Sequence, residues 1–251
     1  MEISAVIITI NEEKNLPRAL KSLDFVDEVV VVDAFSRDRT AEIAESFGAR
    51  VFRREWEGYA SQRNFAMEKA THPWVLFLDA DEEVSQELRE EIMSLDFSAD
   101  GYLIRRESFF AGKPMHCCGW WPDWGIRLFR KEKARWEGEL VHESLVFSGK
   151  TRRLRGKILH YPYQRPRQLF ERMSKYAKLW ALRERGRKNP SWLRVCLQPV
   201  GTFLSSYILK GGIFCGWRGF TVSFAQSYYS FLKYLLLKEE KWTLEKWTLK
   251  K

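Results

Sequence analysis

The chain has 251 residues, 45% of them hydrophobic, which is enough for a packed globular core and excludes a disordered protein. Its net charge of +9 conceals two parts of opposite sign. Residues 1–150 hold 20 Lys and Arg against 28 Asp and Glu, a net −8, whereas residues 151–251 hold 22 against 5, a net +17. An acidic front joined to a basic rear predicts that the rear contacts an anionic surface, either a membrane or a nucleic acid.

The sequence lacks the patterns typical of a signal peptide, a membrane-spanning helix and a disulfide framework. The start of the chain lacks a basic segment and enters a strand at once, so we expect no signal peptide. No charge-free apolar run reaches about 18 residues, so we expect the protein to lie on a membrane rather than through it. The four cysteines form no CxxC pair. We therefore expect reduced thiols, with neither a zinc site nor a disulfide framework, as is usual in the cytosol.

The first hundred residues alternate short apolar runs with amphipathic segments. Apolar, β-branched runs predict strands at residues 3–10, 28–32, 49–52 and 74–78. Apolar residues at helical spacing predict helices at residues 16–23, 41–47, 61–70 and 86–95. This order predicts an α/β fold with a parallel, doubly wound sheet. No GxGxxG follows the first strand, which disfavours a dinucleotide-binding Rossmann domain.

The most informative stretch begins at Trp74, where five apolar residues lead into Asp79-Ala80-Asp81-Glu82-Glu83. The apolar run predicts a strand buried on both faces, and the acids follow where it leaves the sheet. Side chains two positions apart in extended chain point the same way, so Asp79 and Asp81 can converge at the edge where open α/β sheets bind ligands. Mg²⁺ or Mn²⁺ prefers such oxygen ligands and often bridges to phosphates, which predicts a metal–diphosphate site. The alternative is an acidic N-terminus of the helix that starts near Ser85.

The rest of the chain first adds strands and then changes to helices. Strands are predicted at residues 102–106, 125–130, 140–146 and 159–163, around an irregular aromatic stretch at residues 112–124. Long helices are predicted from Arg167 onward, with one apolar stripe through residues 220–235. The tail repeats Lys-Trp-Thr-Leu, and Trp beside Lys is typical of an interfacial anchor. A helical cap on the sheet domain is the alternative interpretation of this region.

Five short motifs occur together in a characteristic order, at residues 6–13, 31–33, 38–40, 62–64 and 78–82. They resemble the nucleotide-sugar half of family-two glycosyltransferases, which have the GT-A fold. Later motifs at residues 119–123, 127–129 and 141–143 are similar to the branch that adds glucose to the lipopolysaccharide inner core, the β-1,4-glucosyltransferase type. The resemblance covers about residues 1–235. One departure is Ala34-Phe35, where many members of the family carry Asp-Gly.

The resemblance implies a role for each matching residue. Thr9, Asn11 and Glu12 correspond to residues that hold uridine and ribose, and Asp33 corresponds to the carboxylate at the uracil edge. The other matching positions are nucleotide-side residues and metal ligands: Gln62, Arg63, Asp79 and Ala80 for the nucleotide-sugar, and Asp81 and His142 for a divalent cation. On the residues alone, Arg63 in a first helical turn is either an anion site or a solvated side chain. A histidine such as His142 is in general more often a satisfied strand residue than a ligand, and within this set of motifs both interpretations stay open.

An inverting sugar transfer needs a stabilised leaving group and a base for the acceptor hydroxyl. We expect a cation at Asp81, supported by Arg127, to stabilise the departing UDP. We expect Asp123, in the aromatic stretch, to be the base, because partial desolvation would raise the pKa of its carboxyl group. Glu143 is the competing candidate for the base. A simple turn residue after Pro122 is the alternative interpretation of Asp123.

The sequence thus predicts a GT-A nucleotide-sugar and catalytic domain at residues 1–164, and a basic, Trp-rich helical region for membrane or acceptor association at residues 165–251. We expect a UDP-sugar transferase that transfers a sugar to a lipid-linked lipopolysaccharide-core acceptor, and glucose is the sugar that we expect. We expect the enzyme to act at the cytoplasmic face of the plasma membrane. We expect its docking on anionic membranes to weaken with salt. One alternative is a transferase with a polyprenyl-phosphate acceptor. Another is a basic nucleic-acid-binding protein, but the acidic front would repel a phosphate backbone.

Overall fold

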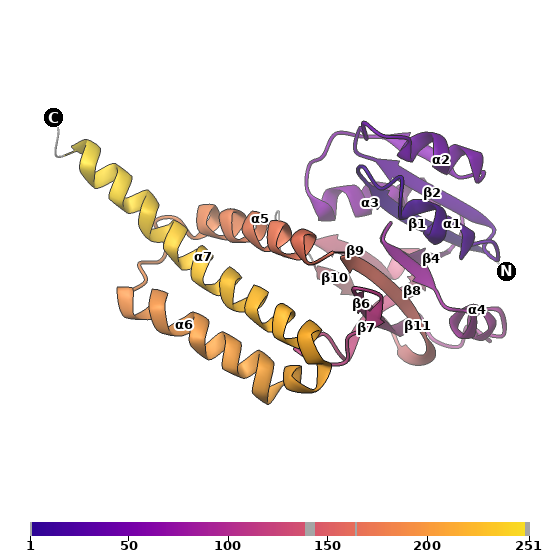
Figure 1. The fold of residues 1–251 in the computed structure, drawn as a ribbon. Coiled ribbons are helices and arrows are strands. Elements are labelled where there is room, and N and C mark those ends of the chain that lie inside the picture. The colour runs from indigo at the N-terminus through magenta and orange to yellow at the C-terminus, as the bar shows by residue number, and fades with distance from the viewer. Residues whose placement is uncertain (1, 139–143, 164, 249–251) are drawn as a thin grey trace. The chain divides into compact units, whose positions relative to one another are not determined.

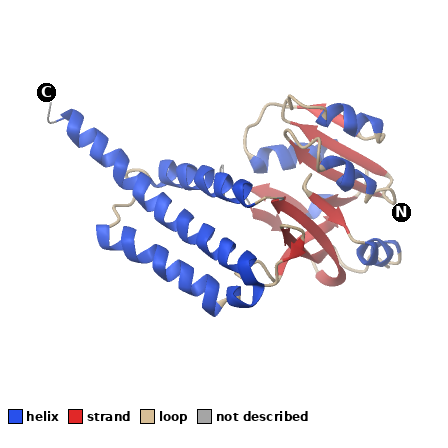
Figure 2. Ribbon diagram, in the orientation of Figure 1, coloured by secondary structure: helices blue, strands red, loops and turns tan. Residues whose placement is uncertain are grey.

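The computed structural model describes residues 2–138, 144–163 and 165–248, with side chains described as far as residue 239. The chain forms two compact units, one made of Met1–Glu107 and Pro122–Tyr161 and the other of Ser108–Trp121 and Pro162–Lys251. Most strands belong to the first unit, and the long helices belong to the second (Figures 1 and 2). The expected boundary after residue 164 stays a prediction about function. The compact units differ from it because residues 108–121 group with the C-terminal helices.

The parallel part of the sheet follows the predicted order of strands. It consists of β1 (Ile3–Thr9), β2 (Glu28–Asp33), β3 (Arg50–Arg53) and β4 (Trp74–Phe77), paired in the order β3-β2-β1-β4. Every residue of β1 and β4 is buried. Both faces of these strands are covered, which is why they appear in the sequence as unbroken apolar runs.

Beyond β4 the sheet continues in antiparallel pairs. β8 (Asp123–Arg130) pairs with β4 and with β6 (Gly101–Phe110), and β11 (Thr151–Tyr163) lies between β6 and the short edge strand β5 (Glu82–Val84). β7 (Lys113–Pro114) pairs with the end of β6, while β9 (Ala134–Glu137) and β10 (Ser144–Phe147) form a separate hairpin after the short turn η1 (Lys131–Lys133). The expected fold class, α/β with a helical C-terminal region, is confirmed. Residues 140–143 of the strand expected at 140–146 lie outside the described residues.

Helices cover both faces of the sheet in the first unit. α1 (Leu16–Lys21), α2 (Thr40–Ser46) and α4 (Gln86–Met93) contribute Leu16, Ala44 and Leu88 to one core cluster. α3 (Tyr59–Lys69) contributes Ala66 and Met67 to the other. Ser85 caps α4 by accepting a hydrogen bond from the Leu88 backbone N–H. Because β5 lies between the acidic turn and this cap, the interpretation of Asp79 and Asp81 as a helix N-terminus is wrong.

The second unit is built on three long helices, as the sequence predicts. These are α5 (Pro166–Glu184), α6 (Trp192–Leu204) and α7 (Gly216–Thr248), and α7 packs along both α5 and α6 (Figure 1). A short π-helical turn, η2 (Ser205–Leu209), and a 3-10 turn, η3 (Gly212–Cys215), connect α6 to α7. Within the described residues, no helix is long and apolar enough to cross a membrane.

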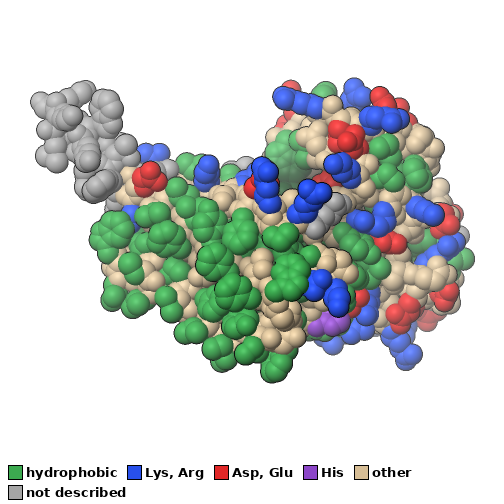
Figure 3. All heavy atoms as spheres, in the orientation of Figure 1, with side chains coloured by type: hydrophobic (Ala, Val, Ile, Leu, Met, Phe, Trp, Pro, Cys, Tyr) green, Lys and Arg blue, Asp and Glu red, His purple; other side chains and the backbone are tan. Residues whose placement is uncertain are grey.

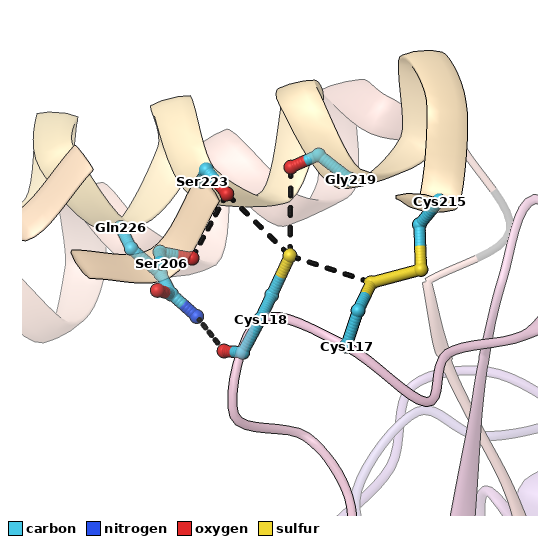
Figure 4. The surroundings of a disulfide bond; sticks show 7 residues. All are labelled: Cys117, Cys118, Ser206, Cys215, Gly219, Ser223 and Gln226. Carbon is cyan, nitrogen blue, oxygen red and sulfur yellow. Dashed lines mark hydrogen bonds between the residues drawn. A yellow bond between two sulfur atoms is a disulfide. The ribbon is translucent and has the colours of Figure 1, made fainter. Parts of the chain in front are cut away.

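One expectation about the cysteines is wrong. Cys117 and Cys215 form a disulfide bond, which joins the stretch after β7 to the last residue of η3, directly before α7 (Figure 4). The neighbouring Cys118 is a buried free thiol beside the Ser223 hydroxyl, and the Gln226 side-chain amide donates a hydrogen bond to the Cys118 carbonyl at 3.0 Å. This pairing could not be predicted from local sequence, because the two cysteines are 98 positions apart.

Candidate active site

The acidic turn after β4 is closed by two hydrogen bonds between its ends. The Asp79 backbone N–H donates to Glu82 Oε2 at 2.9 Å, and the Glu82 N–H donates to the Asp79 carbonyl at 2.9 Å. Glu82 is the first residue of β5 and is fully buried. The turn therefore holds its carboxylates at the carboxyl end of a parallel strand, which is the expected position for a ligand site.

Three arginines from three different elements surround these carboxylates. Arg63 of α3 lies with its Nη2 3.3 Å from Asp79 Oδ1. Arg127 of β8 reaches Asp79 Oδ2 at 3.7 Å and Glu82 Oε1 at 3.0 Å. Arg106 of β6 reaches Glu82 Oε1 at 3.4 Å. Each carboxylate thus faces two guanidinium groups.

The charges of this network keep Asp79 ionised despite its burial. Burial alone raises the pKa of Asp79, but Arg63, Arg127, Arg106 and His160 together lower the pKa below its ordinary value. Burial likewise lowers the pKa of Arg106, and the neighbouring carboxylates outweigh that and raise it. The site is therefore an assembly of compensated ions with a defined geometry.

Asp81 has a different environment from Asp79. His160 of β11 is its ionisable partner among the described residues, with Nε2 3.4 Å from Asp81 Oδ2, and the Asp81 carbonyl accepts a hydrogen bond from the Tyr161 N–H at 2.9 Å. Both side chains are largely buried, at 14% and 12% exposed. His160 comes into place because β11 pairs with β5, with His160 opposite Glu82. The described residues contain no group of three His, Cys, Asp or Glu that could hold a metal ion.

The expected base, Asp123, joins the same network through Arg106. It is the first residue of β8 rather than a turn residue, and it lies opposite Arg106 in the β6–β8 pair. Arg106 donates to Asp123 Oδ2 from Nη2 at 2.6 Å and from Nε at 2.8 Å. The Asp123 side chain is still 42% exposed, so a molecule from solvent can reach it. Glu143 and His142 lie outside the described residues.

The residues expected at the uridine end tie two loops together. Asp33 accepts hydrogen bonds from the backbone N–H and the hydroxyl of Ser36. The Asn11 N–H donates to Ser36 Oγ at 2.8 Å, and the Arg37 N–H donates to Asn11 Oδ1 at 2.8 Å. The Glu12 N–H donates to a threonine hydroxyl of α2 at 2.8 Å. Asn11 and Asp33 therefore fix the edge formed by the loops after β1 and β2.

Two buried oxygen atoms of the expected nucleotide-binding residues have no hydrogen-bond partner in the part of the chain that the structure describes. The Thr9 hydroxyl at the end of β1 and Gln62 Oε1 in α3 have no hydrogen-bond partner among the described residues. Buried polar atoms are normally satisfied, so an unsatisfied one calls for a ligand or water. The Gln62 amide nitrogen is used, because it donates to the carbonyls of Arg54 and Glu55.

The expected residues thus fall into distinct places within the first unit. Arg63, Asp79, Arg127 and Asp123 share one charge network, with the Arg63 guanidinium 4.3 Å from the centre of the Trp136 ring. Ala80 is buried within the acidic turn. Sequence reasoning missed the site roles of Glu82, Arg106 and His160. The only available sign was that Glu82 extends the acidic run, and that Arg106 and His160 fall in predicted strands.

Comparison with known proteins assigns the front of the chain to a family. The model described as "Glycosyl transferase family 2" matches residues 4–144. The lipopolysaccharide core biosynthesis glycosyltransferase LpsC of Rhizobium meliloti (strain 1021) is 32% identical over 92% of this chain and 90% of its own length. The uncharacterized glycosyltransferase RT0209 of Rickettsia typhi is 32% identical over 95% and 87%. Among solved structures, S. aureus TarS 1–349 in complex with UDP-GlcNAc matches 97% of this chain and 92% of its own, with 16% identity and a TM-score of 0.49.

Proposed function

We propose that the chain, which belongs to glycosyl transferase family 2, transfers a sugar from a UDP-sugar to a lipid-linked acceptor of the lipopolysaccharide core. The sugar that we propose is glucose. The relative LpsC is named for lipopolysaccharide core biosynthesis and matches over 90% of its length, which supports an acceptor from the lipopolysaccharide core. The observation that carries the proposal is the acidic turn after β4, with three arginines and a histidine gathered around it.

A divalent cation fits beside Asp81. Two arginines already neutralise Asp79, whereas the one ion pair of Asp81 within the described part of the chain is with the imidazole of His160. Carboxylate oxygen and neutral imidazole nitrogen both suit Mn²⁺, and the diphosphate of the donor can complete its coordination. Asp81 would hold the ion together with His142, as the resemblance implies, or with His160. A bound cation would neutralise charge on the diphosphate as UDP departs.

The arginines would supply fixed positive charge beside the leaving group. Arg63 and Arg127 are held by Asp79 and Glu82 before any ligand arrives, so little reorganisation is needed when negative charge develops. The unsatisfied Thr9 hydroxyl and Gln62 carbonyl oxygen are candidate contacts for the nucleotide. Asn11, Glu12 and Asp33 would support the same end by fixing its loops.

We propose Asp123 as the base that takes the proton from the acceptor hydroxyl. Arg106 occupies its Oδ2, which orients the carboxylate and leaves Oδ1 for the hydroxyl. Glu143 is the rival. Asp123→Asn should keep affinity for the UDP-sugar and abolish transfer, because the amide keeps the shape and cannot accept the proton. If Glu143→Gln behaves in this way while Asp123→Asn stays active, Glu143 is the base.

The site of action would be the cytoplasmic face of the plasma membrane, where the acceptor lipid lies in the bilayer. The net +17 of residues 151–251 supports peripheral association with an anionic surface. The repeated Lys and Trp of the tail would add to it, although the side chains of residues 240–251 lie outside those that the structure describes.

Thermal-shift measurements with UDP-, GDP- and TDP-sugars, each with and without Mn²⁺, test the donor. We expect the largest stabilisation with a UDP-sugar and Mn²⁺ together, because only that pair engages the nucleotide edge and Asp81 at once. Asp81→Ala should then lower the transfer rate by roughly two to four orders of magnitude. Near-normal transfer by this variant in EDTA would refute a metal role for Asp81.

A further inference from the structure

The second unit exposes an apolar surface that the proposed chemistry does not use. It is formed by α6 from Val195 onward, the two turns η2 and η3, and the first half of α7, and we call residues 195–231 the apolar hairpin. These 37 residues include two charged side chains, Lys210 and Arg218, and no Asp or Glu. Figure 3 shows hydrophobic side chains gathered over α6 and α7.

The hairpin is apolar on the outside as well as on the inside. Val195 and Val222 are buried in the unit, as expected for helices that pack on one another. Yet Leu209 and Phe214, in the connection between α6 and α7, are 81% and 89% exposed, and Trp217 is 53% exposed. Monomeric soluble proteins rarely expose contiguous apolar patches of more than a few hundred Å², and larger ones mark interaction sites.

Cations and aromatic rings gather at the end of the hairpin opposite to that connection. Arg194 lies 5.2 Å from the centre of the Tyr234 ring, and Lys238 lies 5.7 Å from that of Trp192. Over residues 162–238 the chain holds 14 Lys and Arg against 2 Asp and Glu. Aromatic rings beside cations, next to an apolar segment, are the composition of a protein surface at the level of lipid headgroups.

We propose that the apolar hairpin inserts into one leaflet of a lipid bilayer, with the exposed ring of Trp192 and the cations Arg194 and Lys238 at the headgroups. The occupant is a membrane rather than a second copy of the chain, because a second copy would bring the same excess of Lys and Arg over residues 162–238, whereas anionic headgroups complement that charge. Because the 13 residues of α6 span about 20 Å, more than the roughly 15 Å of hydrocarbon in one leaflet, the hairpin lies at a slant or along the membrane plane to remain within that leaflet.

This inference deepens the proposed function and rests on it for the lipid-linked acceptor, but it changes the expected physics of docking. Anionic lipids would add affinity through the cations, as expected from the net charge of the rear of the chain. The main driving force would come from burial of Leu209, Phe214 and their neighbours, which salt does not screen. Binding should therefore persist with neutral lipid and at high salt.

The test is co-sedimentation of the full chain with vesicles of pure phosphatidylcholine, in about 0.1 M and about 1 M NaCl, where the Debye length falls from about 10 Å to about 3 Å. The intact protein should bind at both salt concentrations. Leu209→Glu with Phe214→Glu should weaken binding at least tenfold, since burial of one such side chain is worth about that factor. Both positions are almost fully exposed, so the substitutions leave the packing intact.

A matched control places the same charges on exposed apolar residues of the first unit. Phe47→Glu with Met93→Glu changes side chains that are 50% and 55% exposed, and should bind vesicles like the intact protein. Equal binding by both double variants, or binding to anionic vesicles at low salt alone, would overturn the inference. So would light scattering that finds a dimer for the intact chain and a monomer for Leu209→Glu with Phe214→Glu, because a second copy would then cover the surface.

Titration with UDP-glucose separates this inference from the proposed function. The hairpin variant should bind the nucleotide as the intact chain does, because neither substituted residue belongs to the donor site. A protein that binds UDP-glucose and ignores phosphatidylcholine vesicles would refute insertion and leave the transferase proposal standing. A protein that inserts but binds no nucleotide-sugar would refute the transferase proposal and support insertion.

Discussion

Replacing Glu82 by glutamine removes one charge from the centre of the arginine network and keeps the shape of the side chain. Glu82 is fully buried, with Arg127 Nη2 at 3.0 Å, Arg106 Nη1 at 3.4 Å and the Asp79 N–H at 2.9 Å. The glutamine carbonyl can still accept from the Asp79 N–H, so the turn keeps its hydrogen bond. What is lost is the partner of two largely buried guanidinium groups. Loss of one member of a buried ion pair costs about 3–5 kcal/mol.

Urea denaturation measures this cost directly. A domain of ordinary stability unfolds at about 5–15 kcal/mol, so Glu82→Gln should remain folded with a clearly lower midpoint. Glu42→Gln is the matched control, because Glu42 pairs with Arg39 on the surface at 3.1 Å, with side chains 71% and 76% exposed. An exposed pair of this kind contributes less than about 1 kcal/mol. Equal losses in the two variants, at unchanged slope, would show that the buried network does not stabilise the fold.

Three further predictions concern other parts of the chain. Burial raises the pKa of Glu28, but hydrogen bonds from Ser4, Thr71 and Arg50 lower it to about 2. The ionised Glu28 carboxylate therefore stabilises the fold above the pKa that it has in the unfolded chain, and this stabilisation is lost as the pH falls toward 2. The intact protein and Glu28→Gln should differ in unfolding midpoint near neutral pH and converge in acid. Phe35 has a φ of +55°, so Phe35→Gly should raise the free energy of unfolding by up to about 1 kcal/mol, whereas Phe47→Gly, at a φ of −89°, should lower it. Cys215→Ser opens a cross-link between residues 98 apart and should cost about 4–5 kcal/mol of stability under oxidising conditions, while Cys196→Ser, at an exposed free thiol, should cost little.

The sequence predicted the parallel half of the fold well because burial leaves a direct mark there. β1 and β4 are covered on both faces, so their residues form unbroken apolar runs, and an acid directly after such a run can lie only at the strand's carboxyl end. The position of Asp79 and Asp81 followed from that alone. The burial of a strand and the position of the acids after it both depend on residues close together in the chain, so a short stretch of sequence is enough to predict them.

The long strands of the antiparallel half were predicted, but their pairing was not, because long-range register decides it. Arg106 meets Asp123 and Glu82 only because β6 pairs with β8, and His160 reaches Asp81 only because β11 pairs with β5. In the sequence these residues are polar side chains within predicted strands. The sequence does not indicate which face of the sheet they lie on or which strand they pair with. The exposure of Leu209 and Phe214 escaped for a related reason, because the apolar hairpin carries hydrophobic residues on both its packed and its open faces.

The two aspartates of the turn differ in what surrounds them, and this explains how an acidic unit can receive an anionic donor. The first 150 residues carry a net −8, which would repel a diphosphate if the carboxylates were unopposed. Asp79 and Glu82, however, form ion pairs with Arg63, Arg106 and Arg127. These pairs make the site close to neutral. Asp81 has no guanidinium among the ion pairs of the described residues, which agrees with the cation role that we propose for its carboxylate. An arginine held rigidly by a buried carboxylate needs no further ordering when the leaving group develops its charge, and that preorganisation is where electrostatic catalysis gains most.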